Sequence, residues 1–144
     1  MAEDVIAVMD AVGLERADMM GYSMGGRIAV SLLARYAGRF SSVVVGGAGL
    51  PPAVSDAPTR AAIAAALELD QVDEGALRRV QVPVLAVVGD NDGALPLTQR
   101  LVETIPDAQL AVLPGEDHLS TISAQKYKDA TAAFLKKDRP VSVA

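Results

Sequence analysis

The chain has 144 residues and a formal net charge of −5, and 51% of its residues are apolar although only 3% are aromatic. This length fits one domain with a core built mostly from Ala, Val, Leu and Ile. The sequence has no Cys, no run of Lys and Arg, and no apolar stretch that could span a bilayer, which argues against disulfides, thiolate metal sites, nucleic-acid partners and membrane insertion. Because the acidic N-terminus does not resemble a signal peptide, we expect a cytoplasmic globular protein.

Patterns typical of helices and of buried strands alternate along the chain. The helical patterns cover residues 3–12, 24–37, 61–69, 74–79, 97–105 and 119–136. The strand patterns cover residues 17–22, 41–45, 83–88 and 109–113. The last helix is expected to turn Ile122, Ala130, Ala133 and Phe134 inward. Alternating strands and helices imply parallel pairing with right-handed crossovers. The fold class is therefore α/β, with an open, mainly parallel sheet of about four strands and flanking helices.

Residues 21–26 read Gly-Tyr-Ser-Met-Gly-Gly and lie between a strand pattern and a helical pattern. In a Gly-x-Ser-x-Gly arrangement, a strand turns sharply into a helix and leaves the serine exposed, which is the nucleophile elbow of serine hydrolases. We expect Gly21 and Gly25 to provide room for this strained turn, and Gly26 to let the helix pack closely. The helix N-terminus adds unpaired N–H groups and the positive end of its dipole. Ser23 is therefore the candidate nucleophile, and a simple helix-capping role is the alternative.

A serine hydroxyl needs a base within hydrogen-bond reach and an acid that orients the base. His118 is the single histidine of the sequence and follows the last predicted strand. Asp90 and Asp92 follow the strand at 83–88 and compete for the role of the acid, although Asp90 could instead close the turn. The two acidic residues directly before His118 are expected to be solvated loop charges. Because loops after parallel strands gather at one edge of a sheet, we expect these side chains to meet Ser23 there.

The order Ser, Asp, His, with the serine on an elbow, resembles the α/β-hydrolase superfamily over almost the whole chain. Val82-Pro83-Val84-Leu85, followed by Gly89-x-x-Asp92, is similar to the strand and turn that carry the acid in this family, which assigns that role to Asp92. Gly115-x-x-His118 resembles the loop that carries the base. The elbow is similar to those of esterases, enol-lactonases and cofactor-free haloperoxidases. The resemblance implies hydrolysis of small or short-chain carboxylic esters through an acyl-enzyme, an oxyanion bound by the Met24 N–H, and no metal or organic cofactor.

By this resemblance, residues 1–144 form a single truncated α/β-hydrolase domain, with a reduced helical cap at about residues 49–81. The candidate substrate-binding residues are Tyr22, Leu50, Pro51, Ile63 and Leu67. So short a cap implies an open site that suits small esters. The family strands that would precede the elbow, with the loop that supplies a second oxyanion donor, have no counterpart in the sequence. Since the loss of one such donor costs about 100- to 1,000-fold in rate, we expect less efficient catalysis.

The strand at 17–22 is central in the family and becomes an edge when its usual neighbours are missing. It carries Met19 and Met20, and an open apolar edge invites pairing with another chain. We therefore expect a homodimer through this edge. The alternative function is that of a non-catalytic or weakly active half-fold that acts through oligomerisation or partner binding.

Overall fold

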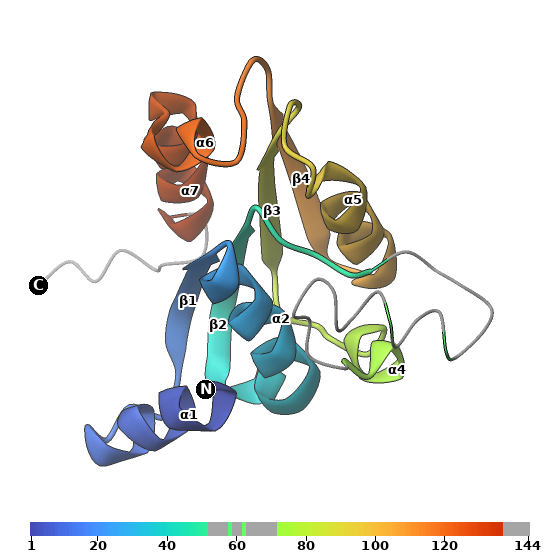
Figure 1. Ribbon diagram of the computed structural model, residues 1–144. Helices are drawn as coiled ribbons and strands as arrows, with labels where there is room; N and C mark the ends of the chain where they lie inside the picture. Colours follow the sequence, from blue (N-terminus) through green and yellow to red (C-terminus); the bar gives the residue numbers. More distant parts are fainter. Residues whose placement is uncertain (52–57, 59–61, 63–71, 137–144) are drawn as a thin grey trace, which may run out of the picture.

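The computed structural model describes residues 1–51, 58, 62 and 72–136 of the chain (Figure 1). In chain order, the elements are α1 (Ala2–Ala11), β1 (Ala17–Tyr22), α2 (Met24–Tyr36), the 3-10 helix η1 (Ala37–Arg39), β2 (Phe40–Gly46), α4 (Glu74–Leu77), β3 (Val84–Gly89), α5 (Leu95–Thr104), β4 (Ala108–Leu113), α6 (Ser120–Ser123) and α7 (Gln125–Lys136). Each strand lies within a residue or so of its predicted position. None of the described helices is long and apolar enough to cross a membrane.

The four strands form one parallel sheet in the order β1-β2-β3-β4, so the predicted fold class is confirmed. The register places Gly21 beside Val45, Val44 beside Leu85, and Val88 beside Val112. β2 and β3 are the inner strands and are buried almost throughout, because a strand covered on both faces is apolar along its whole length. In the described sheet, β1 forms one edge, as expected, and β4 forms the other.

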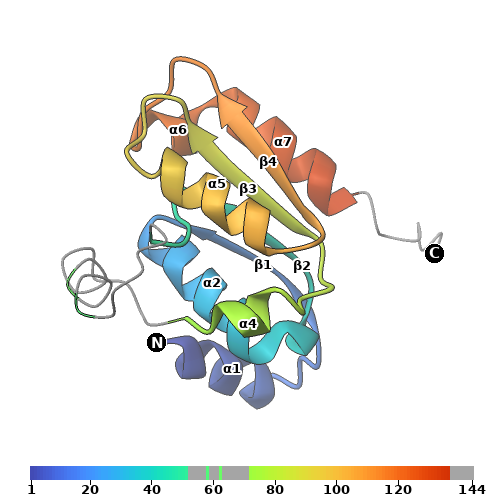
Figure 2. The same cartoon turned by 90° about the vertical axis from the view of Figure 1, so that its right-hand side faces the viewer.

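Helices cover both faces of the sheet. Figure 2 shows α1, α2, α4 and α5 in front of the strands and α7 behind them. The front core joins these helices to alternate strand residues such as Val43 and Val45. The rear core joins Tyr127 and Phe134 of α7 to Val44, whose side chain points to the opposite face. All four strands run in the same direction, so their carboxyl ends and the loops that follow them lie at the same end of the sheet.

The predicted single helix at 119–136 is wrong in one respect, because Ala124 is extended, with ψ 137, and separates α6 from α7. The inner residues of α7 are Tyr127, Thr131 and Phe134. These positions are spaced by four and three residues and so share one side of a helix. Ile122 belongs to the short α6 beyond the break and is 47% exposed. Ala133, also expected inside, is exposed.

Candidate active site

Ser23 lies at the sharp turn between β1 and α2. Among the residues that the structure describes, Ser23 is the only non-glycine residue with a positive φ, which is 52°. A side chain in this conformation costs free energy, and such residues cluster at functional sites. The Ser23 N–H donates to the Gly46 carbonyl at 2.8 Å, which ties the turn to the end of β2. The backbone thus has the strained geometry expected of a nucleophile elbow.

The glycines of the turn differ in how much space surrounds them. A Cβ at Gly21 would collide with the backbone carbonyl of Gly25, and a Cβ at Gly26 would lie 2.8 Å from both the Ala48 Cβ and the Gly46 oxygen. A Cβ at Gly25 would meet nothing within 4 Å. The expectation that Gly25 provides room is therefore wrong. The close packing falls on Gly21 and Gly26, because these are the positions where α2 touches the strands.

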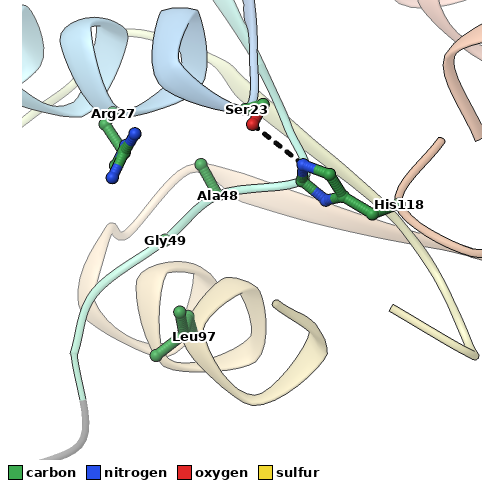
Figure 3. Close-up of a pocket in the computed structure, with 7 residues that line it drawn as sticks. Ser23, Arg27, Ala48, Gly49, Leu97 and His118 are labelled. Carbon is green, nitrogen blue, oxygen red and sulfur yellow. Dashed lines mark hydrogen bonds between the residues drawn. The ribbon is translucent and has the colours of Figure 1, made fainter. Parts of the chain in front are cut away.

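The structure brings Ser23, His118 and Asp92 into one hydrogen-bonded row. The His118 Nε2 is 2.8 Å from the Ser23 Oγ (Figure 3), and the His118 Nδ1 is 2.8 Å from the Asp92 Oδ2. When Nδ1 carries its proton toward the carboxylate, Nε2 is left as the acceptor for the serine O–H. The arrangement can therefore remove a proton from Ser23.

The two candidate acids have different partners. Asp92 is buried, with 6% of its surface exposed, and its second oxygen accepts a hydrogen bond from the Ala94 N–H at 2.8 Å. Asp90 instead accepts from the Gly115 N–H at 2.8 Å and joins the turn after β3 to the turn after β4. Asp90 thus closes the turn, which was the alternative role expected for it, and Asp92 is the carboxylate that contacts His118.

The loop that carries His118 is held by two side chains. The Tyr22 hydroxyl donates to the His118 carbonyl at 2.6 Å, and the two rings lie 5.5 Å apart. Burial raises the pKa of Tyr22, which keeps this donor protonated. Asp117 is exposed, but its Oδ1 accepts from the Leu119 and Ser120 N–H groups at 2.8 Å. Sequence reasoning missed this role of Asp117, and the signal was its Asp-x-x-Ser spacing, which is typical of a capped turn.

A cavity of about 190 Å³ lies beside Ser23. Its lining comprises Ser23, Arg27, Gly47, Ala48, Gly49, Leu97 and His118 (Figure 3). Residues 47–49 follow β2, so the rule that loops after parallel strands meet at one edge would have found them. Arg27 follows Ser23 by one turn of α2, and this helical spacing was the signal for it.

Three of the predicted substrate-binding residues, Tyr22, Leu50 and Pro51, are not among the residues that line this cavity. Tyr22 is beside His118 and Tyr127, outside the cavity lining. Leu50 is 1% exposed and belongs to the core, and the Pro51 carbonyl accepts from Arg100 at 2.6 Å. Ile63 and Leu67, with most of the predicted cap, lie outside the described residues.

Met24 is the first residue of α2, where the backbone N–H has no partner within the helix. The positive end of the helix dipole lies at the same place. An oxyanion formed next to Ser23 would therefore be close to a backbone donor and a favourable field. The Met24 residue is 54% exposed.

Comparisons with known proteins agree with this fold. A family model described as the alpha/beta hydrolase fold matches residues 1–71. A protein of Caulobacter sp. (strain K31) with the name "Putative carbamate hydrolase RutD" is 27% identical, over 94% of this chain and 71% of the relative.

Solved structures with the same fold include two hydrolases. The meta-cleavage product hydrolase from Pseudomonas fluorescens IP01 superposes with a TM-score of 0.76 at 18% identity, over 96% of this chain and 71% of that chain. The enol-lactonase from Burkholderia xenovorans LB400 gives a TM-score of 0.71 at 22% identity, over 93% of this chain and 71% of that chain.

Proposed function

We propose that this chain, whose fold is that of the α/β hydrolases, is a serine hydrolase of small carboxylic esters. The observation that carries the proposal is the row Ser23–His118–Asp92, with contacts of 2.8 Å on both sides of the imidazole. Three loops far apart in the sequence supply these groups. A serine, a neutral imidazole and a buried carboxylate in this order are what nucleophilic acyl transfer requires.

In the proposed reaction, the Ser23 Oγ attacks the ester carbonyl while His118 takes its proton. Asp92 orients the imidazole and stabilises its positive charge. The Met24 N–H binds the oxyanion of the tetrahedral intermediate. His118 then protonates the leaving alcohol, and the acyl group stays on Ser23. Water, activated by His118, releases the acid and restores the serine, so each step uses the protein's own groups.

The size of the cavity supports a small substrate. A volume of about 190 Å³ lies below the range of roughly 300–1,000 Å³ typical of sites for drug-sized ligands. The lining residues Ala48, Gly49 and Leu97 offer an apolar surface for a short acyl chain. Because the Caulobacter relative is named for carbamates, a carbamate ester is the second substrate class to test on the same three groups.

The test compares three proteins on p-nitrophenyl acetate and on a p-nitrophenyl carbamate. We expect the wild type to exceed the buffer rate and Ser23→Ala to fall to it. Ser41→Ala removes an exposed serine at the other end of the sheet and should keep the wild-type rate. A fluorophosphonate probe should label Ser23 in the wild type, as read by peptide mass spectrometry. Equal rates for wild type and Ser23→Ala would refute the proposed hydrolase activity and favour a non-catalytic half-fold that binds a partner.

We also propose that the protein forms a homodimer through β1. In the described sheet β1 has one neighbouring strand, and Met20 on it is 56% exposed. A lysine on an edge strand opposes pairing with another strand. In sedimentation at micromolar concentration, we expect a dimeric wild type and a monomeric Met20→Lys variant. Leu110→Lys, at the opposite edge strand β4, is the matched control and should stay dimeric. A monomeric wild type would contradict the proposal.

A further inference from the structure

One wall of the cavity beside Ser23 is a short backbone segment that lies directly on α5. This segment, residues 47–49, follows β2, and it lines the cavity together with Leu97 of α5. A Cβ at Gly49 would collide with the Leu97 carbonyl, so the segment and the helix are in backbone contact. Figure 3 shows Ala48 and Gly49 between α2 and the helix that carries Leu97. The contact with α5 therefore decides where this wall lies.

Thr98 is the side chain of α5 that holds this wall. Its Oγ1 lies 2.9 Å from the Ala48 carbonyl oxygen and 2.9 Å from the carbonyl oxygen of Ala94, one turn earlier in the helix. A hydroxyl has a single proton to donate. The Ala94 carbonyl already accepts from the Thr98 N–H at 2.9 Å, whereas Thr98 is the one donor that the described residues offer to the Ala48 carbonyl. The hydroxyl proton is therefore needed at Ala48.

The hydrogen bond between Thr98 and Ala48 is shielded from water. Thr98 is fully buried, and Ala48 is 4% exposed. A buried carbonyl that loses its donor cannot take a replacement from solvent, so it either stays unpaired at a cost in free energy or moves. The position of Ala48 thus depends on one hydroxyl group.

The two ends of the wall are held by other hydrogen bonds. The Gly47 N–H donates to a carbonyl of β3 at 2.9 Å, and the Leu50 N–H donates to a carbonyl of α5 at 3.0 Å. Neither bond uses the Thr98 hydroxyl. Loss of that hydroxyl should therefore shift Ala48 and Gly49, which lie between these ends and line the cavity, and leave β2 and α5 in place.

We propose that Thr98 determines specificity, because its hydroxyl fixes the wall that limits the length of the acyl chain. This inference rests on the proposed hydrolase function and concerns the substrate choice of the same site. Thr98 is not among the cavity-lining residues, so it is a positioning residue that acts through Ala48. A fixed wall around about 190 Å³ favours a short acyl chain. A displaced wall fits that chain less well and gives a longer chain more room.

An alternative is that Thr98 acts through the acid Asp92. The Ala94 N–H donates to the Asp92 Oδ1 at 2.8 Å, and the Thr98 hydroxyl is also close to the Ala94 carbonyl. In that case, removing the hydroxyl would disturb His118 and slow the hydrolysis of every ester by the same factor. The Thr98 N–H holds the Ala94 carbonyl without the hydroxyl, which favours the role at the wall. Two esters that differ in acyl length distinguish these roles.

The experiment compares p-nitrophenyl acetate with p-nitrophenyl hexanoate, which share a leaving group. We expect Thr98→Val to lower the ratio of kcat/KM for acetate to that for hexanoate by about 3- to 10-fold, the value of one hydrogen bond. Thr98→Ala also lacks the hydroxyl and should do the same, so it serves if Thr98→Val does not fold. Thr98→Ser keeps the hydroxyl and should stay within about two-fold of the wild-type ratio.

Thr104→Val is the matched control. Thr104 is also a buried threonine of α5, and its hydroxyl donates to the carbonyl one turn earlier at 2.8 Å, but it lies outside the cavity lining. This variant should keep the wild-type ratio. Equal losses on both esters in Thr98→Val, or an equal change of the ratio in Thr98→Ser or Thr104→Val, would overturn the inference.

Binding gives a readout that does not need turnover. His118 is the single histidine, so its imidazole NMR signals report on the cavity without overlap. In the Ser23→Ala background, titration with ethyl acetate and with ethyl hexanoate gives a ratio of two dissociation constants, which Thr98→Val should shift toward hexanoate. An unchanged ratio, or no binding of either ester, would overturn the inference. A Ser23→Ala variant that hydrolyses esters as fast as wild type, with the binding ratio shifted as expected, would overturn the proposed function alone.

Discussion

Gly25 and Gly26 are adjacent in the elbow, yet alanine should have opposite effects at the two positions. A Cβ at Gly26 would lie 2.8 Å from the Ala48 Cβ and 2.8 Å from the Gly46 oxygen. The Gly46 oxygen is backbone and belongs to the buried strand β2, so it does not move aside easily. Overpacking of this kind costs about 1–3 kcal/mol. At Gly25 the new methyl group meets nothing within 4 Å.

Gly25 lies within the first turn of α2 and does not have a positive φ. Replacing a glycine in a compatible conformation reduces the entropy of the unfolded chain and gains about 0.4–1 kcal/mol. Urea unfolding of the two single variants measures the contrast. With an m-value of about 2 kcal/mol/M, the Gly26→Ala midpoint should fall by about 0.5–1.5 M, and the Gly25→Ala midpoint should rise by a few tenths of a molar.

Activity gives the second half of this test. Gly25 does not line the cavity, so Gly25→Ala should keep the rate on p-nitrophenyl acetate within about two-fold of wild type. Gly26→Ala should lose activity as well as stability, because displacement of α2 from Gly46 moves Ser23 away from His118. If Gly25→Ala is destabilised as much as Gly26→Ala, the assignment of the close contact to Gly26 is refuted. The Gly-x-Ser-x-Gly motif by itself would extend that cost to Gly25.

Three further predictions concern the groups around His118. Asp92→Asn should lower the esterase rate by about 10³- to 10⁴-fold because the imidazole loses its orienting carboxylate, whereas Asp90→Asn keeps an oxygen acceptor for Gly115 and should stay near the wild-type rate. Tyr22→Phe should lower kcat several-fold with little change in KM, and stability by about 1 kcal/mol, because the His118 loop loses a hydrogen bond outside the cavity. Hydrogen bonds from the backbone, chiefly the Ser120 N–H, lower the pKa of Asp117. The stability that its carboxylate adds is therefore present above the ordinary aspartate pKa of about 3.9 and is lost as the pH falls through the lowered value. Thermal melting of wild type and Asp117→Asn should converge across that window, and a gap independent of pH would contradict the capping role.

Much of the fold follows from local patterns in the sequence. The continuous apolar run ending at Val88 identifies a strand buried on both faces, and the elbow motif locates the junction of β1 and α2. Topology then extends local information to the site. Because parallel strands place their carboxyl ends at one edge, Ser23, His118 and Asp92 were expected to meet, and the structure places them in hydrogen-bond contact. The convergence of these three turns therefore follows from the parallel topology and needs no sequence signal that links them.

The break at Ala124 could not be read from the sequence. The residues on both sides of it have the same helical pattern, and neither Gly nor Pro marks the position. The short α6 begins in the loop held by Asp117, and α7 is placed by the packing of Tyr127 against the rear face of the sheet. The chain leaves the helical conformation at the residue that joins these two constraints. The packing of Tyr127 depends on strand residues that are distant in the sequence, such as Val44 and Val87, so local propensity does not record it.

The orientation of α2 about its own axis explains why Arg27 was not predicted as a cavity residue. An apolar stripe normally indicates which side of a helix faces inward. At the start of α2, however, the close contact is made by Gly26 against Gly46 and Ala48, and a glycine contributes nothing to such a stripe. That contact sets the rotation of the first turn. The same rotation places the side chains of Ser23 and Arg27 beside Ala48 in the cavity. Because this contact involves no side chain on α2, the hydrophobic periodicity does not show it, and Gly26→Ala should displace Ser23 and Arg27 together.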